Sequence, residues 1–67
     1  MVELVKRRKE NGFSCKDMAD KLHISKTFYW QIENCKRRLS YDMAVKIATV
    51  LGTTPDILFL NEYKNKA

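Results

Sequence analysis

The sequence predicts an all-α fold built from five short helices. Its 67 residues include 2 Gly and 1 Pro, which leaves little room for the tight turns of β-hairpins. No stretch of any length alternates polar and apolar residues as a half-buried strand does. Apolar residues recur at helical spacing instead, and serines and threonines stand where they can cap helices. We expect one domain over residues 1–67, with residues 61–67 as a frayed polar tail.

The first helix is expected over residues 2–11. Leu4 begins its apolar stripe, and Arg8 follows four residues later on the same side of the helix. Gly12 is a stop signal because glycine readily adopts the left-handed conformation that ends a helix. Phe13 then lies between two helices, and we expect it to be buried.

Residues 14–34 predict two helices joined by a tight turn. Ser14 can cap the first of them, with Asp17 as the acidic partner of a capping box. The turn falls at residues 23–25, and Ser25 can cap the second helix, which would run to about residue 34. This is the geometry of a helix-turn-helix, whose second helix enters the DNA major groove.

The second helix of this pair has two different faces. At about 100° per residue, Ser25, Tyr29 and Ile32 point one way and form a core stripe. The opposite face is polar with one large aromatic residue: Lys26, Thr27, Trp30, Gln31 and Asn34. Lys, Thr and Gln can read base edges, but a merely solvated helix face would also be polar. Periodicity alone leaves both interpretations open.

A basic loop follows the second helix of the pair. Residues 34–39 contain three consecutive cations, Lys36, Arg37 and Arg38. Such a run is usually a solvated loop. Its position directly after a candidate recognition helix favours contact with DNA phosphates.

Two more helices complete the predicted fold. Ser40 can cap the fourth helix, whose core face is expected to consist of Met43, Ala44, Ile47, Ala48 and Leu51. Thr54 can cap the fifth, with Pro55 at its first helical position. Residues 57–60 are all apolar, and one short helix cannot bury four successive side chains. We expect some of them to face outward and meet a second surface.

Composition favours a binding domain with an anionic partner. Thirteen Lys and Arg against eight Asp and Glu give a net charge of +5, although a merely soluble basic protein would have the same balance. No apolar run approaches the length of a transmembrane helix, and no signal sequence is expected. Cys15 and Cys35 are expected to be reduced thiols in the cytoplasm. With His23 as the single histidine, no metal site or cofactor is expected.

Four segments together carry a family likeness. They are Arg-Lys-Glu-Asn-Gly-Phe-Ser (8–14), Met-Ala-Asp-Lys-Leu-His-Ile-Ser (18–25), Gln-Ile-Glu-Asn-Cys-Lys-Arg (31–37) and Met-Ala-Val-Lys-Ile-Ala-Thr-Val-Leu-Gly-Thr-Thr-Pro-Asp-Ile-Leu (43–58). In these residues the chain resembles the Cro/repressor-type helix-turn-helix family, the lambda-repressor-like, xenobiotic-response-element regulators of bacteria and phages. The resemblance covers residues 2–60 and implies a compact five-helix fold whose second and third helices bind DNA.

The resemblance also implies roles for individual residues. The groove-facing, base-reading positions would be Ser25, Lys26, Thr27, Trp30 and Gln31. The residues on DNA phosphates would be Ser14, Cys15, Lys16, Phe28, Asn34, Lys36, Arg37, Arg38 and Ser40. The resemblance pairs Arg8 with Glu33 as an ion pair between the first and third helices. The alternative for this pair is two independent surface charges.

Some residues depart from the family pattern. Cys15 stands where the family usually has a Gln that bonds a phosphate, and a thiol is a weak donor. His23 and Cys35 stand where Gly is usual, so left-handed backbone there would cost about 1–2 kcal/mol each. Trp30 brings an unusual aromatic to the reading face. It would contact either thymine methyl groups or a neighbouring protein segment.

The leading functional hypothesis is a sequence-specific transcriptional regulator, bound to double-stranded DNA as a homodimer on a palindrome. Lys26 can contact guanine and Gln31 can contact adenine. The candidates for the dimer interface, if they are not part of the core, are Ile57, Leu58, Leu60 and Tyr63. The second hypothesis is an adaptor or antitoxin-like module whose main partner is a regulatory protein. An enzyme is not expected, because the sequence has no acid–base or nucleophilic constellation, and no membrane or small-molecule ligand is expected.

Overall fold

Five helices make up the fold, as the sequence predicts. The computed structural model describes the backbone of residues 1–64 and the side chains of residues 1–59. The helices are α1 (Val2–Glu10), α2 (Cys15–Leu22), α3 (Lys26–Glu33), α4 (Tyr41–Val50) and α5 (Pro55–Lys64), and residues 1–64 contain no strand. The predicted all-α class is therefore confirmed. None of these helices is both long and apolar enough to cross a lipid bilayer.

Four helices begin at the caps that the sequence predicts. Ser14 and Asp17 form a complete capping box, with the Ser14 Oγ 3.0 Å from the Asp17 backbone nitrogen and the Asp17 Oδ2 2.8 Å from the Ser14 nitrogen. The hydrogen bonds from Ser14 hold the pKa of Asp17 below its ordinary value. At α3, α4 and α5, the hydroxyls of Ser25, Ser40 and Thr54 accept from the backbone N–H three residues on, at 3.0, 3.1 and 3.3 Å. These local bonds fix where each helix starts.

The helix ends use left-handed backbone at four residues. Two are glycines, Gly12 and Gly52, with φ of 73° and 68°. The other two, His23 and Cys35, have φ of 59° and 58°. The Cβ atom of a non-glycine residue is crowded in this conformation. The conformational strain anticipated from the sequence is therefore present after α2 and after α3.

Replacing Cys35 with glycine is expected to stabilise the protein by about 1 kcal/mol, because glycine adopts the left-handed conformation without strain. His23→Gly should have an effect of the same sign and size. The matched control is Asn11→Gly, at a helix end with an ordinary φ of −84°, where glycine relieves nothing and should not stabilise. Urea unfolding would measure all three. Equal or lower midpoints for Cys35→Gly and His23→Gly would contradict this account.

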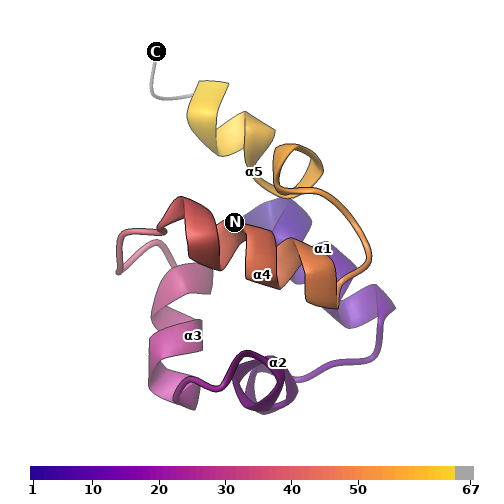
Figure 1. The fold of residues 1–67 in the computed structure, drawn as a ribbon, viewed down its shortest axis with the longest axis vertical. Coiled ribbons are helices and arrows are strands. Elements are labelled where there is room, and N and C mark those ends of the chain that lie inside the picture. The colour runs from indigo at the N-terminus through magenta and orange to yellow at the C-terminus, as the bar shows by residue number, and fades with distance from the viewer. Residues whose placement is uncertain (65–67) are drawn as a thin grey trace.

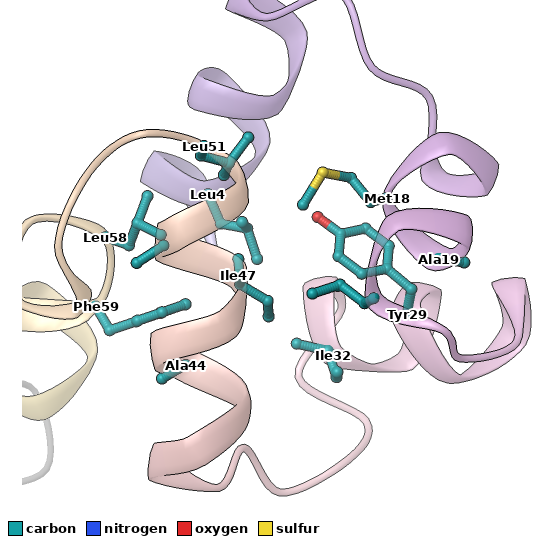
Figure 2. Packing of buried hydrophobic residues seen from close by; sticks show 12 residues of the cluster. Leu4, Met18, Ala19, Tyr29, Ile32, Ala44, Ile47, Leu51, Leu58 and Phe59 are labelled. Carbon is teal, nitrogen blue, oxygen red and sulfur yellow. The ribbon is translucent and has the colours of Figure 1, made fainter.

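Every helix contributes to one hydrophobic core. Figure 2 shows α4 in its centre, with buried residues of α2 and α3 on one side and those of α5 on the other. The buried members are Leu4, Met18, Ala19, Leu22, Tyr29, Ile32, Ala44, Ile47, Ala48, Leu51, Leu58 and Phe59. Phe13 is half-buried rather than buried, with the Lys21 Nζ 4.7 Å from its ring centroid. The core therefore holds α3 by its inner face, while Lys26, Thr27 and Trp30 on the outer face are exposed in the described part of the chain.

The helices are spread along the longest dimension of the molecule, whose extents are 33 × 22 × 19 Å. The α2–α3 pair lies at one end and α5 at the other, with α4 between them (Figure 1). The candidate reading helix and the fifth helix are therefore at opposite ends of the fold.

The consecutive apolar residues at 57–60 on α5 do not all face the core. Leu58 and Phe59 lie in the core, 3% and 1% exposed, whereas Ile57 is 51% exposed. Because Leu58 is buried in the core, it is not available for the dimer interface in which we expected it. The side chains of Leu60 and Tyr63 lie outside the described residues. The helix itself continues to Lys64, past residue 60, where we expected the ordered chain to end.

Candidate nucleic-acid interface

A tight left-handed turn joins α2 to α3. His23 adopts φ 59° and ψ 41°, and the Ile24 N–H donates to the Ala19 carbonyl oxygen at 3.0 Å. This pairing is typical of a helix that ends with a left-handed residue. Ile24 packs against the core, and Ser25 then starts α3 at once. The turn therefore sets the angle between the two helices, because no longer loop separates them.

The two faces of α3 differ as the sequence predicts. Tyr29 and Ile32 are fully buried, whereas Lys26 and Thr27 are exposed and Trp30 retains 48% of its surface. Ser25 is the exception among the residues expected to face the core. It is exposed because its hydroxyl serves as the cap of α3. One side of α3 thus belongs to the core, and the other offers side chains to a partner.

A buried ion pair fixes the back of α3 to α1. The Arg8 Nε lies 2.5 Å from the Glu33 Oε2, and the Nη2 lies 3.2 Å from the Oε1. Arg8 also donates from its Nη1 to the Phe13 carbonyl oxygen at 2.8 Å. Both partners are buried, at 9% and 7% exposure, so the predicted pair is confirmed and the alternative of two surface charges is wrong. The hydrogen bond to Glu33 raises the pKa of Arg8 above its ordinary value.

Most of the residues expected on phosphates are exposed at the start of α2 and in the loop after α3. They are Ser14, Lys16, Asn34, Lys36, Arg37, Arg38 and Ser40. Among them, Lys16 pairs with Asp20 at 3.0 Å and the Asn34 Nδ2 donates to the Trp30 carbonyl oxygen at 2.9 Å. Surface pairs of this kind are weak and can exchange for a phosphate.

One cation of the loop folds back on α3. The Arg37 Nε donates to the Gln31 Oε1 at 3.0 Å, and its guanidinium carbon lies 4.4 Å from the centroid of the Phe28 ring. This contact was not expected from the sequence, in which Arg37 is one of three consecutive loop cations with nothing to distinguish them. The signal that could have found it is a left-handed residue at Cys35, which reverses the chain beside the helix.

Comparison with known proteins agrees with this geometry. A family model described as helix-turn-helix matches residues 4–58, from the first turn of α1 into α5. The chain belongs to the Cro/C1-type helix-turn-helix family. Searches of curated proteins and of solved structures found no match. Membership makes the α2–α3 pair a DNA-binding helix-turn-helix and the chain a DNA-binding regulator of this general type.

Cys15, which the resemblance placed among the phosphate contacts, has a side chain that packs against the core. The thiol is half-buried, with its Sγ 4.0 Å from the Glu33 Oε1. A side chain placed in this way faces the buried ion pair. Any phosphate contact at this position would therefore come from the backbone N–H at the start of α2.

Tyr29 places a buried hydroxyl close to the same ion pair. Its side chain is fully buried, and within the described part of the chain the hydroxyl has no hydrogen-bond partner. Burial, and secondarily the Glu33 carboxylate, raises the pKa of Tyr29 well above its ordinary value. The phenol therefore stays neutral in the folded protein under conditions in which an exposed tyrosine ionises.

This shift predicts an alkaline loss of stability. Above pH 10 the unfolded chain releases the Tyr29 proton while the folded protein keeps it, so the stability of the wild type should fall by about 1.4 kcal/mol per pH unit from this group. Tyr29→Phe should remove that part of the decline and leave stability at pH 7 unchanged or slightly higher. Urea unfolding between pH 8 and about 11 measures it, with exposed Tyr41→Phe as the control. Parallel profiles for wild type and Tyr29→Phe would refute the prediction.

Proposed function

We propose that the protein is a sequence-specific transcriptional repressor that inserts α3 in the major groove as a homodimer on a palindromic operator. The observation that carries this proposal is the asymmetry of α3. Its inner face is locked by the core and the Arg8–Glu33 pair, and its outer face exposes Lys26, Thr27 and Trp30. A rigid helix with free polar side chains suits direct reading of base edges.

Selection of bound sites from a random DNA pool tests the specificity. We expect an enriched palindrome, because one small domain reads only a few base pairs and two copies double the site. Its half-sites should lie about one turn apart, at ~34 Å. Lys26→Ala should change the base selected at one position of each half-site. Lys6→Ala, an exposed lysine of α1, serves as a charge-matched control and should leave the site unchanged. A pool without enrichment would refute sequence-specific binding.

Phosphate contacts would supply much of the affinity. The exposed cations Lys16, Lys36 and Arg38 flank the reading helix in the chain, and Ser14 and Ser40 lie beside them at helix starts. Neutralising phosphates releases counterions, so affinity should fall steeply with salt. Binding that does not change between about 50 and 200 mM salt would argue against this mode.

Ile57 is the described residue best suited to a dimer contact. It is 51% exposed at the first turn of α5, next to the buried Leu58 and Phe59. Sedimentation of the wild type, alone and with operator DNA, should show a dimer that Ile57→Asp weakens. A strict monomer at high micromolar concentration, with one copy on a single half-site, would remove the homodimer from the proposal.

Trp30 reports on which partner covers the outer face of α3. An indole at a thymine methyl group would be buried on binding, and its emission would change when operator DNA is titrated in. Unchanged emission on a bound operator would favour a protein partner for this residue. A protein that retards no DNA at low salt would favour the adaptor hypothesis, for which the exposed Trp30 is the supporting observation.

A further inference from the structure

The loop after α3 is bent so that it returns alongside the helix. Cys35 adopts the left-handed conformation, its N–H donates to the Ile32 carbonyl oxygen at 3.2 Å, and the Lys36 N–H donates to the Gln31 carbonyl oxygen at 2.8 Å. This pair of bonds is the Schellman arrangement, which reverses the chain direction at a helix end. Arg37 is the next residue, and it therefore lies beside the last turns of α3 instead of pointing away from them.

Arg37 bridges two residues that are three positions apart on α3. Its guanidinium carbon lies 4.4 Å from the centroid of the Phe28 ring, and its Nε donates to the Gln31 Oε1 at 3.0 Å. Arginine carries only donors, so the Gln31 atom that it contacts must be the carbonyl oxygen. The contact fixes which way the amide of Gln31 faces. Within the described part of the chain, the Gln31 Nε2 and the Arg37 Nη groups have no hydrogen-bond partner and can still donate.

This orientation changes what Gln31 can read. A glutamine that reads adenine donates to the base N7 and accepts from the N6 amino group, so it needs both amide atoms. Here one of the two lone pairs of the Gln31 Oε1 is engaged by Arg37, and every other polar hydrogen-bonding atom of the pair, the Gln31 Nε2 and the Arg37 Nη groups, is a donor. The major-groove edge of guanine offers two acceptors, N7 and O6, and matches a surface made mainly of donors better than adenine does, because adenine also presents a donor.

We propose that Arg37 is a positioning residue for base reading, which orients Gln31 so that the pair selects guanine instead of adenine. This inference rests on the proposed function and deepens it. It revises the expectation that Gln31 contacts adenine. It also separates Arg37 from Arg38, which is exposed and forms no hydrogen bond or ion pair within the described part of the chain.

Site selection with four proteins tests the proposal. Gln31→Ala identifies the base pair that Gln31 reads, because the base preference changes at that position of the selected site. The wild type should select guanine there, and Arg37→Ala should reduce the preference for guanine over adenine by about tenfold at that position. Arg38→Ala is the matched control, because it removes the same charge from the same loop. It should lower affinity for all sites alike. Far-ultraviolet circular dichroism would show that each variant is folded.

The outcomes separate the two proposals. If the wild type enriches no sequence, the proposed function fails and the role of Arg37 fails with it. If the wild type enriches an operator but selects any base other than guanine under Gln31, only the role of Arg37 is overturned. The role of Arg37 is also overturned if Arg37→Ala leaves the base preference unchanged and only weakens binding, as Arg38→Ala does. Gln31→Glu adds a second check, because it keeps an acceptor for Arg37 but has no N–H to donate. It should also lose the preference for guanine.

Discussion

Glu33→Ala is expected to destabilise the protein by about 3–5 kcal/mol, because it leaves the buried Arg8 guanidinium without its counter-charge. Domains have a total stability of only about 5–15 kcal/mol, and a 67-residue chain has a small core. The variant should therefore unfold at much lower urea concentration than the wild type. Urea denaturation followed by circular dichroism measures the difference.

A surface pair provides the control for this prediction. Glu3 and Arg7 form an ion pair of 2.9 Å between partly exposed side chains one turn apart on α1. Glu3→Ala should change the urea midpoint little, because water screens such a pair. Replacing both buried partners with apolar residues, in Arg8→Met with Glu33→Leu, should recover most of the stability that Glu33→Ala loses. Equal urea midpoints for Glu33→Ala and Glu3→Ala would show that the buried pair matters no more for stability than the surface pair.

Phe59→Ala is the second substitution with a large expected effect. Phe59 is 1% exposed and packs on the α5 side of the core (Figure 2). Removing a buried phenylalanine side chain costs about 3–5 kcal/mol, from lost transfer free energy and from the cavity that remains. Thermal or urea unfolding should show a loss of this size.

Ile57→Ala is the matched control, two residues away on the same helix. Its side chain is 51% exposed, so truncation should change stability by less than about 1 kcal/mol. A small effect of Phe59→Ala would mean that α5 is dispensable for the core. A large effect of Ile57→Ala in dilute monomer would mean that Ile57 belongs to the core and not to a surface for a second copy.

Local chemistry made the helix boundaries predictable. Ser14, Ser25, Ser40 and Thr54 each cap a helix through a bond that spans only three residues, so the sequence contains both partners. Periodicity likewise identified the buried face of α3, except at Ser25, where capping overrode the stripe. The Arg8–Glu33 pair joins residues 25 positions apart. It was predictable only from the family resemblance, because no local rule connects positions so distant.

The remaining features depend on how the helices pack. Periodicity shows that four successive apolar residues cannot all be buried, but the docking angle of α5 decides that Leu58 and Phe59 are inside and Ile57 outside. The direction of the Cys15 thiol and the isolation of the Tyr29 hydroxyl follow from the same packing. The left-handed backbone at Cys35 was anticipated, but only side-chain packing decides that Arg37, once the chain has reversed, contacts Gln31 and Phe28.

The division of α3 into a locked face and a free face has a consequence for how such a regulator can diversify. Lys26, Thr27 and Trp30 are exposed, so their side chains add little to the core that holds the fold together. Substitutions at these three positions should therefore be nearly neutral for folding, and under the function that we propose they would alter which operators are recognised. Mutations can then change the regulatory targets while the fold stays intact. Duplicated copies of the gene would need only a few substitutions to bind different targets.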